Sequence, residues 1–293
     1  MRRGRDAVDD IRTVVSRLLR RDFPAQRQAY GFREAILYAL GLGLGVPATD
    51  PAQRPFVLEG PGLRVLPSMA VVLASPGFWL RDADPRFPWQ HVLHMRQELE
   101  IHRPLLPEDV LTGRTLIEAI HDKGAGRGAV LVTRHELANG EGRPVATARK
   151  LEYCRGMGGF GGEGGPRAPG IALPDREPDH VAEWRFPEQA ALLYRLNGDL
   201  NPLHVDPAVA REAGFARPVL HGLCTYGAIC WLIVRDLCGG DPARLRALAM
   251  DFTLPVYPGD AIRLLLWRVG DDHVFAAERD GERIVANGLA RLA

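Results

Sequence analysis

The amino-acid sequence predicts an α+β protein built from two copies of one unit. "AILYAL" at 35–40 resembles "ALLYRL" at 191–196, and "RPLLPED" at 103–109 resembles "LPVYPGD" at 254–260. The two matches come in the same order with nearly the same offset, which indicates an internal duplication. Each copy begins with a helical pattern and ends in β-rich runs, an order typical of α+β folds rather than of alternating βαβ units.

Length and composition narrow the function classes. The 293 residues allow one large domain or two of about 150. A net charge of +1 gives no indication of a nucleic-acid partner, which usually needs a concentrated basic face. The four cysteines show no metal-like pairing with histidines, so we interpret them as reduced thiols in the cytoplasm. Because the apolar runs are shorter than the roughly 18 residues of a membrane span, we expect no membrane insertion.

The first 23 residues predict a short amphipathic helix packed on the domain. Ile11, Val14, Val15, Leu18 and Leu19 recur at helical spacing with arginines around them. A transit peptide would look similar but would avoid acidic residues, and four aspartates lie in this stretch. A frayed extension is the alternative.

A glycine- and proline-rich stretch separates the two copies. It contains a literal G-x-G-x-x-G from Gly156 to Gly161. A dinucleotide site would need this loop to open a helix, and the glycines and prolines that follow forbid one. We therefore expect no cofactor and interpret 155–180 as a flexible linker between an N-terminal unit at 1–154 and a C-terminal unit at 181–293.

"NGDLNPLHVD" at 197–206 carries the strongest indication of chemistry. Gly198 ends one helical pattern, and Asp206 with the following proline begins another, so Asp199, Asn201 and His204 lie on a short connector between helices. Asp and His together can hold a water and move a proton at neutral pH. A cap or turn explains any one of these residues equally well, but the full constellation favours catalysis.

A second stretch, "RPVLHGLCTYG", leads into a long apolar helix predicted over 220–237. The backbone N–H of Gly222 lies at its start, where it can polarise a carbonyl oxygen. We interpret His221 as a buried structural imidazole. An Asp/His pair that holds water, together with a polarised carbonyl, suggests addition of water across a double bond conjugated to that carbonyl.

These residues also carry a resemblance. "YRLNGDLNPLHVDPAVAREAGFARPVLHGLCTYG" closely resembles the hydratase 2 motif of the MaoC-like (R)-specific enoyl-CoA hydratases. "ILYALGLG", "FVLEG", "DKGAG", "GGFGG" and "PVYPGD" are similar to the hydratase half of peroxisomal multifunctional enzyme type 2, so the resemblance covers nearly the whole chain from about Tyr30. It implies a double hotdog fold, in which each unit is a helix wrapped by an antiparallel sheet.

The resemblance also implies roles for individual residues. Asp199 and His204 would be the catalytic pair, Asn201 would support them, and Gly222 N–H would bind the thioester oxygen. The family's CoA contacts map onto His94, Met95, Lys123, Leu200, Pro202, Leu203 and Phe252, with no metal site. The family usually has His-Gly at His94-Met95, and Ser or Thr at Asn197. Glu59 matches an acidic family position and is interpreted as structural or pocket-lining.

The expected activity is hydration of trans-2-enoyl-CoA to (3R)-3-hydroxyacyl-CoA in fatty acid or related acyl-CoA metabolism, such as β-oxidation. The alternatives are a dehydratase of another acyl thioester (a steroid side-chain CoA or an acyl-carrier-protein ester) and a non-catalytic acyl-CoA-binding subunit. The expected partner is an acyl-CoA, with no nucleic acid and no membrane. Pairing into a homodimer is expected by analogy with the family.

The first copy is expected to have lost the chemistry. Gly43 occupies the position that matches Asp199, and no matching histidine lies nearby. Ser75-Pro76-Gly77 interrupts the stretch that would form its central helix. The sheet would then enclose an apolar space for the acyl tail. In the competing interpretation Phe78, Trp79, Phe87 and Trp89 fold back and fill that space.

Overall fold

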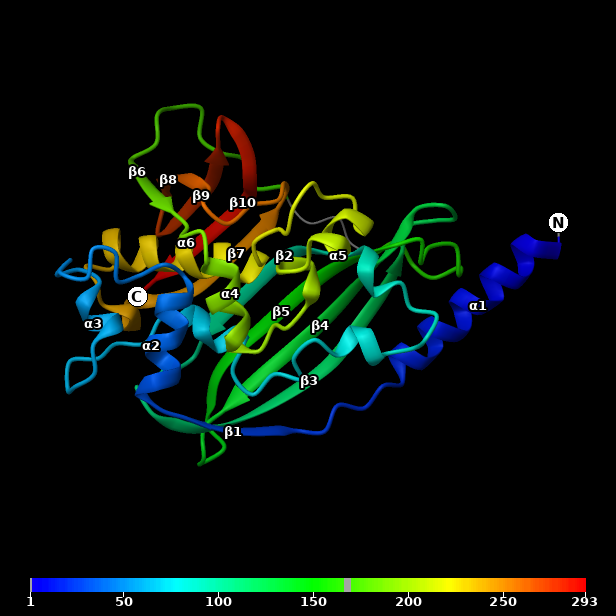
Figure 1. Cartoon of the computed structure of the whole chain (residues 1–293), viewed down its shortest axis with the longest axis horizontal. Helices are drawn as coiled ribbons and strands as arrows, with labels where there is room; N and C mark the ends of the chain where they lie inside the picture. The colour runs from blue at the N-terminus through cyan, green and yellow to red at the C-terminus, as the bar shows by residue number, and fades with distance from the viewer. Residues whose placement is uncertain (1, 166–169) are drawn as a thin grey trace.

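A computed structural model describes residues 2–165 and 170–293 of the chain (Figure 1). Residues 166–169 of the linker expected at 155–180 lie outside the described residues. The strands are β1 (Gln26–Tyr30), β2 (Val92–Ile101), β3 (Asp109–Asp122), β4 (Gly128–Ala138), β5 (Pro144–Arg155), β6 (His180–Arg185), β7 (Leu245–Phe252), β8 (Ala261–Val269), β9 (Asp272–Arg279) and β10 (Glu282–Leu292).

Short helices connect these strands. The α-helices are α1 (Arg2–Leu19), α2 (Phe32–Gly41), α3 (Arg54–Val57), α4 (Ala190–Tyr194), α5 (Pro207–Glu212) and α6 (Gly222–Asp236). Six 3-10 turns complete the described part of the chain: η1 (Pro67–Val71), η2 (Trp79–Asp82), η3 (Trp89–His91), η4 (Arg195–Asn197), η5 (Pro202–His204) and η6 (Pro242–Arg244).

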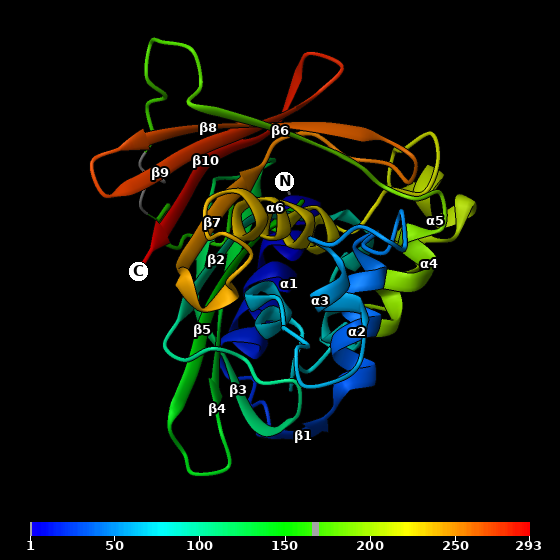
Figure 2. The same cartoon turned by 90° about the vertical axis from the view of Figure 1, so that its left-hand side faces the viewer.

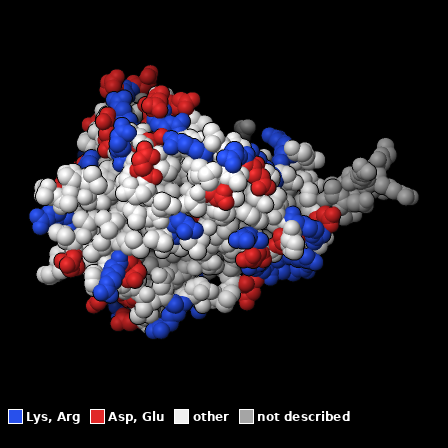
Figure 3. All heavy atoms as spheres, viewed as in Figure 1, with Lys and Arg blue, Asp and Glu red and all other residues white. Residues whose placement is uncertain are grey.

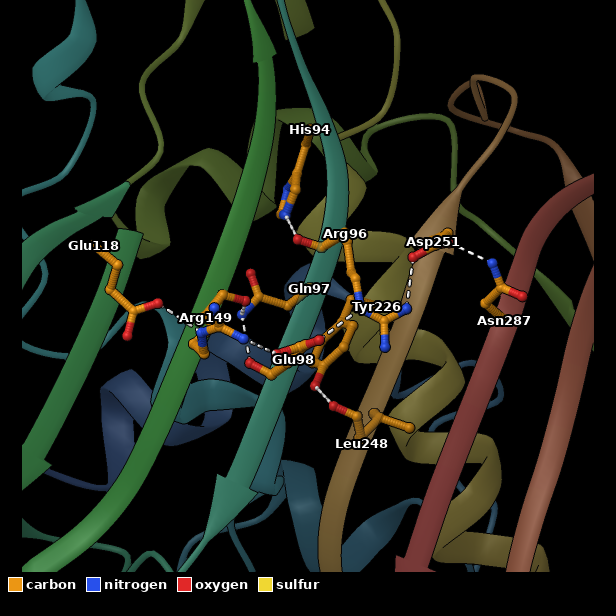
Figure 4. A network of polar contacts seen from close by, with 10 residues as sticks. All are labelled: His94, Arg96, Gln97, Glu98, Glu118, Arg149, Tyr226, Leu248, Asp251 and Asn287. Carbon is orange, nitrogen blue, oxygen red and sulfur yellow. Dashed lines mark hydrogen bonds and ion pairs between the residues drawn. The ribbon is translucent and has the colours of Figure 1, made fainter. Parts of the chain in front are cut away.

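The strands form one antiparallel sheet whose order confirms the duplication. The ten strands run β1-β3-β4-β5-β2-β7-β10-β9-β8-β6, so each half has the same internal order and the halves meet at β2 and β7. Leu99 faces Leu248 across this junction, and Arg96 Nη1 lies 2.6 Å from Asp251 Oδ1 (Figure 4). The double hotdog architecture expected from the sequence is therefore present.

Helix α6 occupies the concave side of the sheet (Figure 2). Its sequence is apolar almost throughout, and eleven consecutive residues from Cys224 to Val234 are buried. A helix that is apolar on all sides must be covered on all sides. The strands cover one side, and Tyr38 and Leu42 of the α2 segment cover another, since both approach Gly227.

The first half has no corresponding α-helix in its described residues. Between α3 and β2 the chain forms only the 3-10 turns η1, η2 and η3, and Ser75-Pro76-Gly77 lies between η1 and η2. The predicted loss of the central helix is confirmed. Two other elements cover the ends of this half: η1 joins the main core, and α1 packs Val14, Val15 and Leu18 against Trp79 and Phe87 in a second cluster.

The G-x-G-x-x-G stretch has a structural explanation. The carboxylate of Asp122, at the end of β3, accepts hydrogen bonds from the N–H groups of Gly124, Gly159 and Gly161 at 2.7–2.8 Å. Gly159 and Gly161 have positive φ, which glycine adopts without strain. The loop thus encloses a protein carboxylate, and none of its described residues begins a helix.

The described helices include none long and apolar enough to cross a bilayer. On the face shown in Figure 3, lysine and arginine side chains are interspersed with aspartate and glutamate. This face therefore offers no concentrated basic surface.

The contact between α6 and α2 yields a stability prediction. A Cβ at Gly227 would lie 2.5 Å from Leu42 Cδ2 and 2.9 Å from Tyr38 Oη. We expect Gly227→Val to lower the free energy of unfolding by about 1–3 kcal/mol through overpacking, measured by urea denaturation. Gly62→Val is the control, because a Cβ there has no neighbour within 4 Å. Equal stability of the two variants would contradict the close packing.

Candidate active site

The connector that carries the predicted pair is rigid for local reasons. Gly198 turns the chain with φ +109° after η4. The side chain of Asn201 accepts a hydrogen bond from Leu203 N at 3.0 Å and so caps η5. Asp206 accepts one from Ala208 N at 2.7 Å and caps α5, as the sequence predicts. Asp199 and His204 are therefore fixed at either end of a short capped turn.

The structure brings Asp199 and His204 together. One carboxylate oxygen of Asp199 and one ring nitrogen each of His204 and His221 lie within 4.8 Å of one another. His204 Nδ1 lies 2.8 Å from the carbonyl oxygen of Val219. A carbonyl can only accept, so Nδ1 carries the proton, and Nε2 of the neutral ring has a free lone pair. The site thus presents two proton acceptors side by side.

His221 supports this pair from behind. It is fully buried, as expected, and its ring stacks on that of His204 with centroids 3.7 Å apart. Its Nε2–H donates to the backbone oxygen of Asp199 at 3.2 Å. His221 therefore fixes both the main chain of Asp199 and the ring plane of His204.

The surroundings set the protonation states. Burial disfavours the charge on Asp199, but His204, His221 and the Asn201 N–H outweigh it and hold the pKa of this carboxyl below its ordinary value. Burial also lowers the pKa of His204, although Asp199 opposes this, and it lowers the pKa of His221 to about 3. At neutral pH the site therefore contains a carboxylate and two neutral imidazoles.

The three side chains suit proton transfer better than metal binding. Their donor atoms are close enough to hold an ion. The lone pair of an imidazole lies in the ring plane, however, and the planes of His204 and His221 are only 28° from parallel. Stacked rings direct their lone pairs side by side rather than toward one point.

Gly222 provides a hydrogen-bond donor on the wall of the cavity that the pair also lines. It is the first residue of α6, and the N–H groups of a first helical turn have no partner within the helix. A Cβ at this position would lie 3.7 Å from His94 Nδ1 and from the Phe252 ring. Glycine therefore leaves room for an oxygen atom to approach the N–H.

One cavity of about 480 Å³ joins these groups. Asp199, Asn201, His204 and Gly222 line it from the second half, and His94 with Phe252 lines it at the junction of the halves. The His94 and Phe252 rings are in contact, with centroids 4.9 Å apart. From there the cavity continues beneath the first half, where Val71, Val72, Phe78 and Ala148 contribute to its wall.

Some residues expected from the resemblance lie elsewhere. Leu203 lines the cavity, but Leu200 and Pro202 do not, and Leu200 is 55% exposed. Met95 is exposed at an irregularity in the pairing of β2 with β5. Lys123 lies outside the cavity, where its Nζ donates to the Gly164 oxygen.

Glu59 is also displaced from the site. It is exposed in the turn after α3 and is absent from the cavity wall, so the pocket-lining interpretation is wrong.

Polar residues of the first half are the part of the wall that sequence reasoning missed. The set includes Gln97, Thr115, Thr133, His135, Lys150, Glu152 and Arg155, all of which line the cavity. They lie in strands where polar and apolar residues are mixed. Strand alternation alone identifies two faces but not which face is buried.

Comparisons with known proteins agree with this geometry. Residues 29–156 match the MFE-2 hydratase 2 N-terminal domain, and residues 171–287 match the MaoC like domain. A 3-hydroxyacyl-thioester dehydratase Y from Mycobacterium tuberculosis is 39% identical over 80% of this chain and 81% of its own length. A probable enoyl-CoA hydratase 2 from Dictyostelium discoideum is 34% identical, covering 88% and 89%.

A solved structure shows the same architecture. The MaoC-like dehydratase from Phytophthora capsici superposes with a TM-score of 0.82 at 30% identity, covering 95% of this chain and 97% of that one. The fold and site define a double hotdog protein of the MaoC-like class. More narrowly, the chain belongs to the hydratase 2 family, which combines the MFE-2 hydratase 2 N-terminal domain with a MaoC-like domain.

The pair gives the first prediction for activity. Asp199→Asn and His204→Ala should each reduce turnover of a 2-enoyl-CoA by roughly 10²-fold or more, the scale of a positioned acid or base. Acyl-CoA binding should change far less, because neither group supplies much contact area. The control is Asp206→Asn, on the same connector but outside the cavity wall. Near-normal turnover in either dyad variant would contradict the assignment.

The protonation states give a pH prediction. Both Asp199 and His204 have a lowered pKa, so both remain deprotonated at neutral pH and gain protons only as the pH falls. We expect kcat/KM to be level around pH 7 and to decline below about 6.5, the ordinary pKa of histidine. Circular dichroism at each pH would separate this decline from unfolding. An acidic limb centred above that value would contradict a neutral His204.

Proposed function

We propose that the protein hydrates trans-2-enoyl-CoA to (3R)-3-hydroxyacyl-CoA and catalyses the reverse dehydration. The observation that carries this proposal is the position of the Asp199/His204 pair and the Gly222 N–H on the wall of one cavity. Two proton acceptors can hold a water molecule, and an N–H at a helix start can bind an oxygen that gains negative charge. Conjugate addition of water to an unsaturated thioester needs both.

The reaction follows from these positions. Gly222 N–H donates to the thioester oxygen and draws electron density from the C2=C3 double bond. A water between Asp199 and His204 loses a proton to one of them as its oxygen bonds to C3. The charge then resides on the thioester oxygen as an enolate, and a proton delivered from the pair to C2 completes the product. The water thus supplies both the hydroxyl group and the added hydrogen.

The CoA moiety is too large to share the cavity with the acyl chain. We infer that it extends along the surface where Met95, Lys123, Leu200 and Pro202 lie, with Lys123 facing a phosphate. His94, Leu203 and Phe252 would hold the thioester end. The alternative of a non-catalytic binding subunit is less favoured, because the pair and the Gly222 donor are both in place.

The organisation of the chain remains part of the proposal. We assign the units to 1–154 and 181–293 with the linker at 155–180, on the ground that the sheet order is symmetric about β2 and β7. A role in β-oxidation, a cytoplasmic location and a homodimer are proposed by analogy with the family. Size-exclusion chromatography with light scattering would measure the oligomeric state.

The extension of the cavity beneath the first half predicts a preference for longer acyl chains. Trp79 and Phe87 pack against α1 rather than fill the space, and Phe78 meets Trp89 edge to face at 5.6 Å on the wall. Each buried CH₂ can contribute up to about 0.8 kcal/mol. We expect kcat/KM to rise from crotonyl-CoA to medium-chain or long-chain enoyl-CoA esters.

A variant makes this prediction sharper. Ala148→Phe places a ring in the extension, so it should lower kcat/KM for the long esters and leave crotonyl-CoA as an internal control. A kcat/KM that falls steadily from four carbons upward in the unmodified protein would instead favour the aromatic plug.

A further inference from the structure

The wall of the cavity beneath the first half is not uniformly apolar. Thr115 on β3, Thr133 and His135 on β4, and Lys150 and Glu152 on β5 face the cavity from adjacent strands. We name these five residues the polar band. Buried polar groups require partners, and a hydrocarbon ligand would provide none for a charged pair on the cavity wall.

The strand sequences show that the band is bounded on both sides. Along the inward face of β5 the order is Ala146 and Ala148 in the main core, then Lys150 and Glu152, then Cys154 in the second cluster. Along β4 it is Leu137, then His135 and Thr133, then Leu131. The polar stretches of the two strands overlap at the Thr133–Lys150 pair and are offset by one inward position, and each lies between two apolar clusters.

The hydrogen bonds within the band leave specific groups unused. Lys150 Nζ lies 3.0 Å from Glu152 Oε1. The Glu152 side chain is only 8% exposed, and its Oε2 is buried with no partner among the described residues. An ammonium group has three protons, so Lys150 can still donate after bonding to Glu152. The band therefore offers one acceptor and at least one donor close together.

His135 and Thr115 of the band are already paired. His135 Nε2–H donates to the Leu73 oxygen at 3.0 Å, so its Nδ1 accepts from the Thr115 hydroxyl at 2.8 Å. These bonds fix His135 as a neutral ring and hold Thr115 toward it. The groups left for a ligand are consequently those of Lys150 and Glu152, with the hydroxyl of Thr133 next to Lys150 in the pairing of β4 with β5.

We propose that the acyl chain of the preferred substrate carries a hydroxyl group that donates to Glu152 Oε2 and accepts from Lys150 Nζ. A hydroxyl is both donor and acceptor and matches the unused groups. A carboxylate would meet the negative charge of Glu152, and a plain hydrocarbon would remove water from both charges without replacing it. The inference rests on the proposed hydratase activity and adds the chemistry of the acyl chain.

The test compares pairs of trans-2-enoyl-CoA esters of increasing chain length, one plain and one with a hydroxyl on the terminal carbon. At the length that reaches the band, the hydroxylated ester should have a kcat/KM on the order of 10-fold to 100-fold higher, as for hydrogen bonds to charged groups. The same ester with a terminal carboxylate should be disfavoured. No preference at any length, or a preference for the carboxylate, would overturn the inference.

Variants assign the preference to the band. Lys150→Met combined with Glu152→Leu removes both charges together, so neither remains buried alone. This double variant should lose the hydroxyl preference and still turn over the plain esters. Thr133→Val, which is close to isosteric, should reduce the preference by about 2-fold to 10-fold and serves if the double variant does not fold. An unchanged preference in both variants would overturn the assignment.

The control pair lies on the opposite face of the sheet, with Arg149 on β5 and Glu118 on β3. Arg149 Nε lies 2.7 Å from Glu118 Oε2, and neither residue lines the cavity (Figure 4). Arg149→Met with Glu118→Leu should leave the hydroxyl preference intact.

Crotonyl-CoA distinguishes the remaining cases. If the band variants lose crotonyl-CoA turnover as strongly as that of the long esters, the pair contacts the pantetheine arm and the inference is overturned. If the unmodified protein turns over no enoyl-CoA, the proposed function itself fails. Turnover of plain esters without a hydroxyl preference refutes only the inference about the acyl chain.

Discussion

The burial of α6 against the curved sheet is the contact on which the rest of the structure depends. Eleven consecutive residues of this helix are buried, and they occupy the concave side of the second half. The sheet continues into the first half with the same strand order, but there the chain breaks at Ser75-Pro76-Gly77 and supplies only 3-10 turns. Since η1 and α1 cover the two ends of that face, the space between them remains open and forms the extended cavity.

The same asymmetry decides where the chemistry lies. A full helix gives the second half an N-terminus, and with it the free N–H of Gly222. The first half also cannot hold a carboxylate at the position matching Asp199. Gly43 there has φ +99°, and a Cβ would lie 2.7 Å from Pro187 Cδ, a residue that enters α4 of the other copy. Packing against Pro187 therefore requires glycine at this position, so one half provides space and the other provides catalysis.

The sequence was sufficient for features that depend on local pattern. The duplication, the α6 helix, the connector with its Asp206 cap and the break at Pro76 all depend on near neighbours, and each is present. Features that depend on strand register could not be predicted from the sequence. Lys150 and Arg149 are adjacent in sequence, yet only the pairing of β5 with its neighbours decides which of them faces the cavity. The hydrogen bonds from Gly159 and Gly161 to Asp122 could not be predicted for a similar reason, because these glycines are more than 30 residues away in the sequence.

The position of the Lys150–Glu152 pair is informative because such a pair contributes little to stability. Removing two charges from water costs free energy that their attraction only partly returns, and apolar residues of similar volume are often better by about 1–4 kcal/mol. Stability therefore does not explain a pair with a buried carboxylate on a wall between two apolar clusters. Nor is the pair remote from the chemistry: Glu152 is the cross-strand neighbour of His94 in the pairing of β2 with β5. Burial, and after it the charge of Lys150, lower the pKa of His94 to about 3. Because the Lys150–Glu152 pair lies between the catalytic end and the acyl space, it can contact a polar group that the acyl chain carries beyond its double bond.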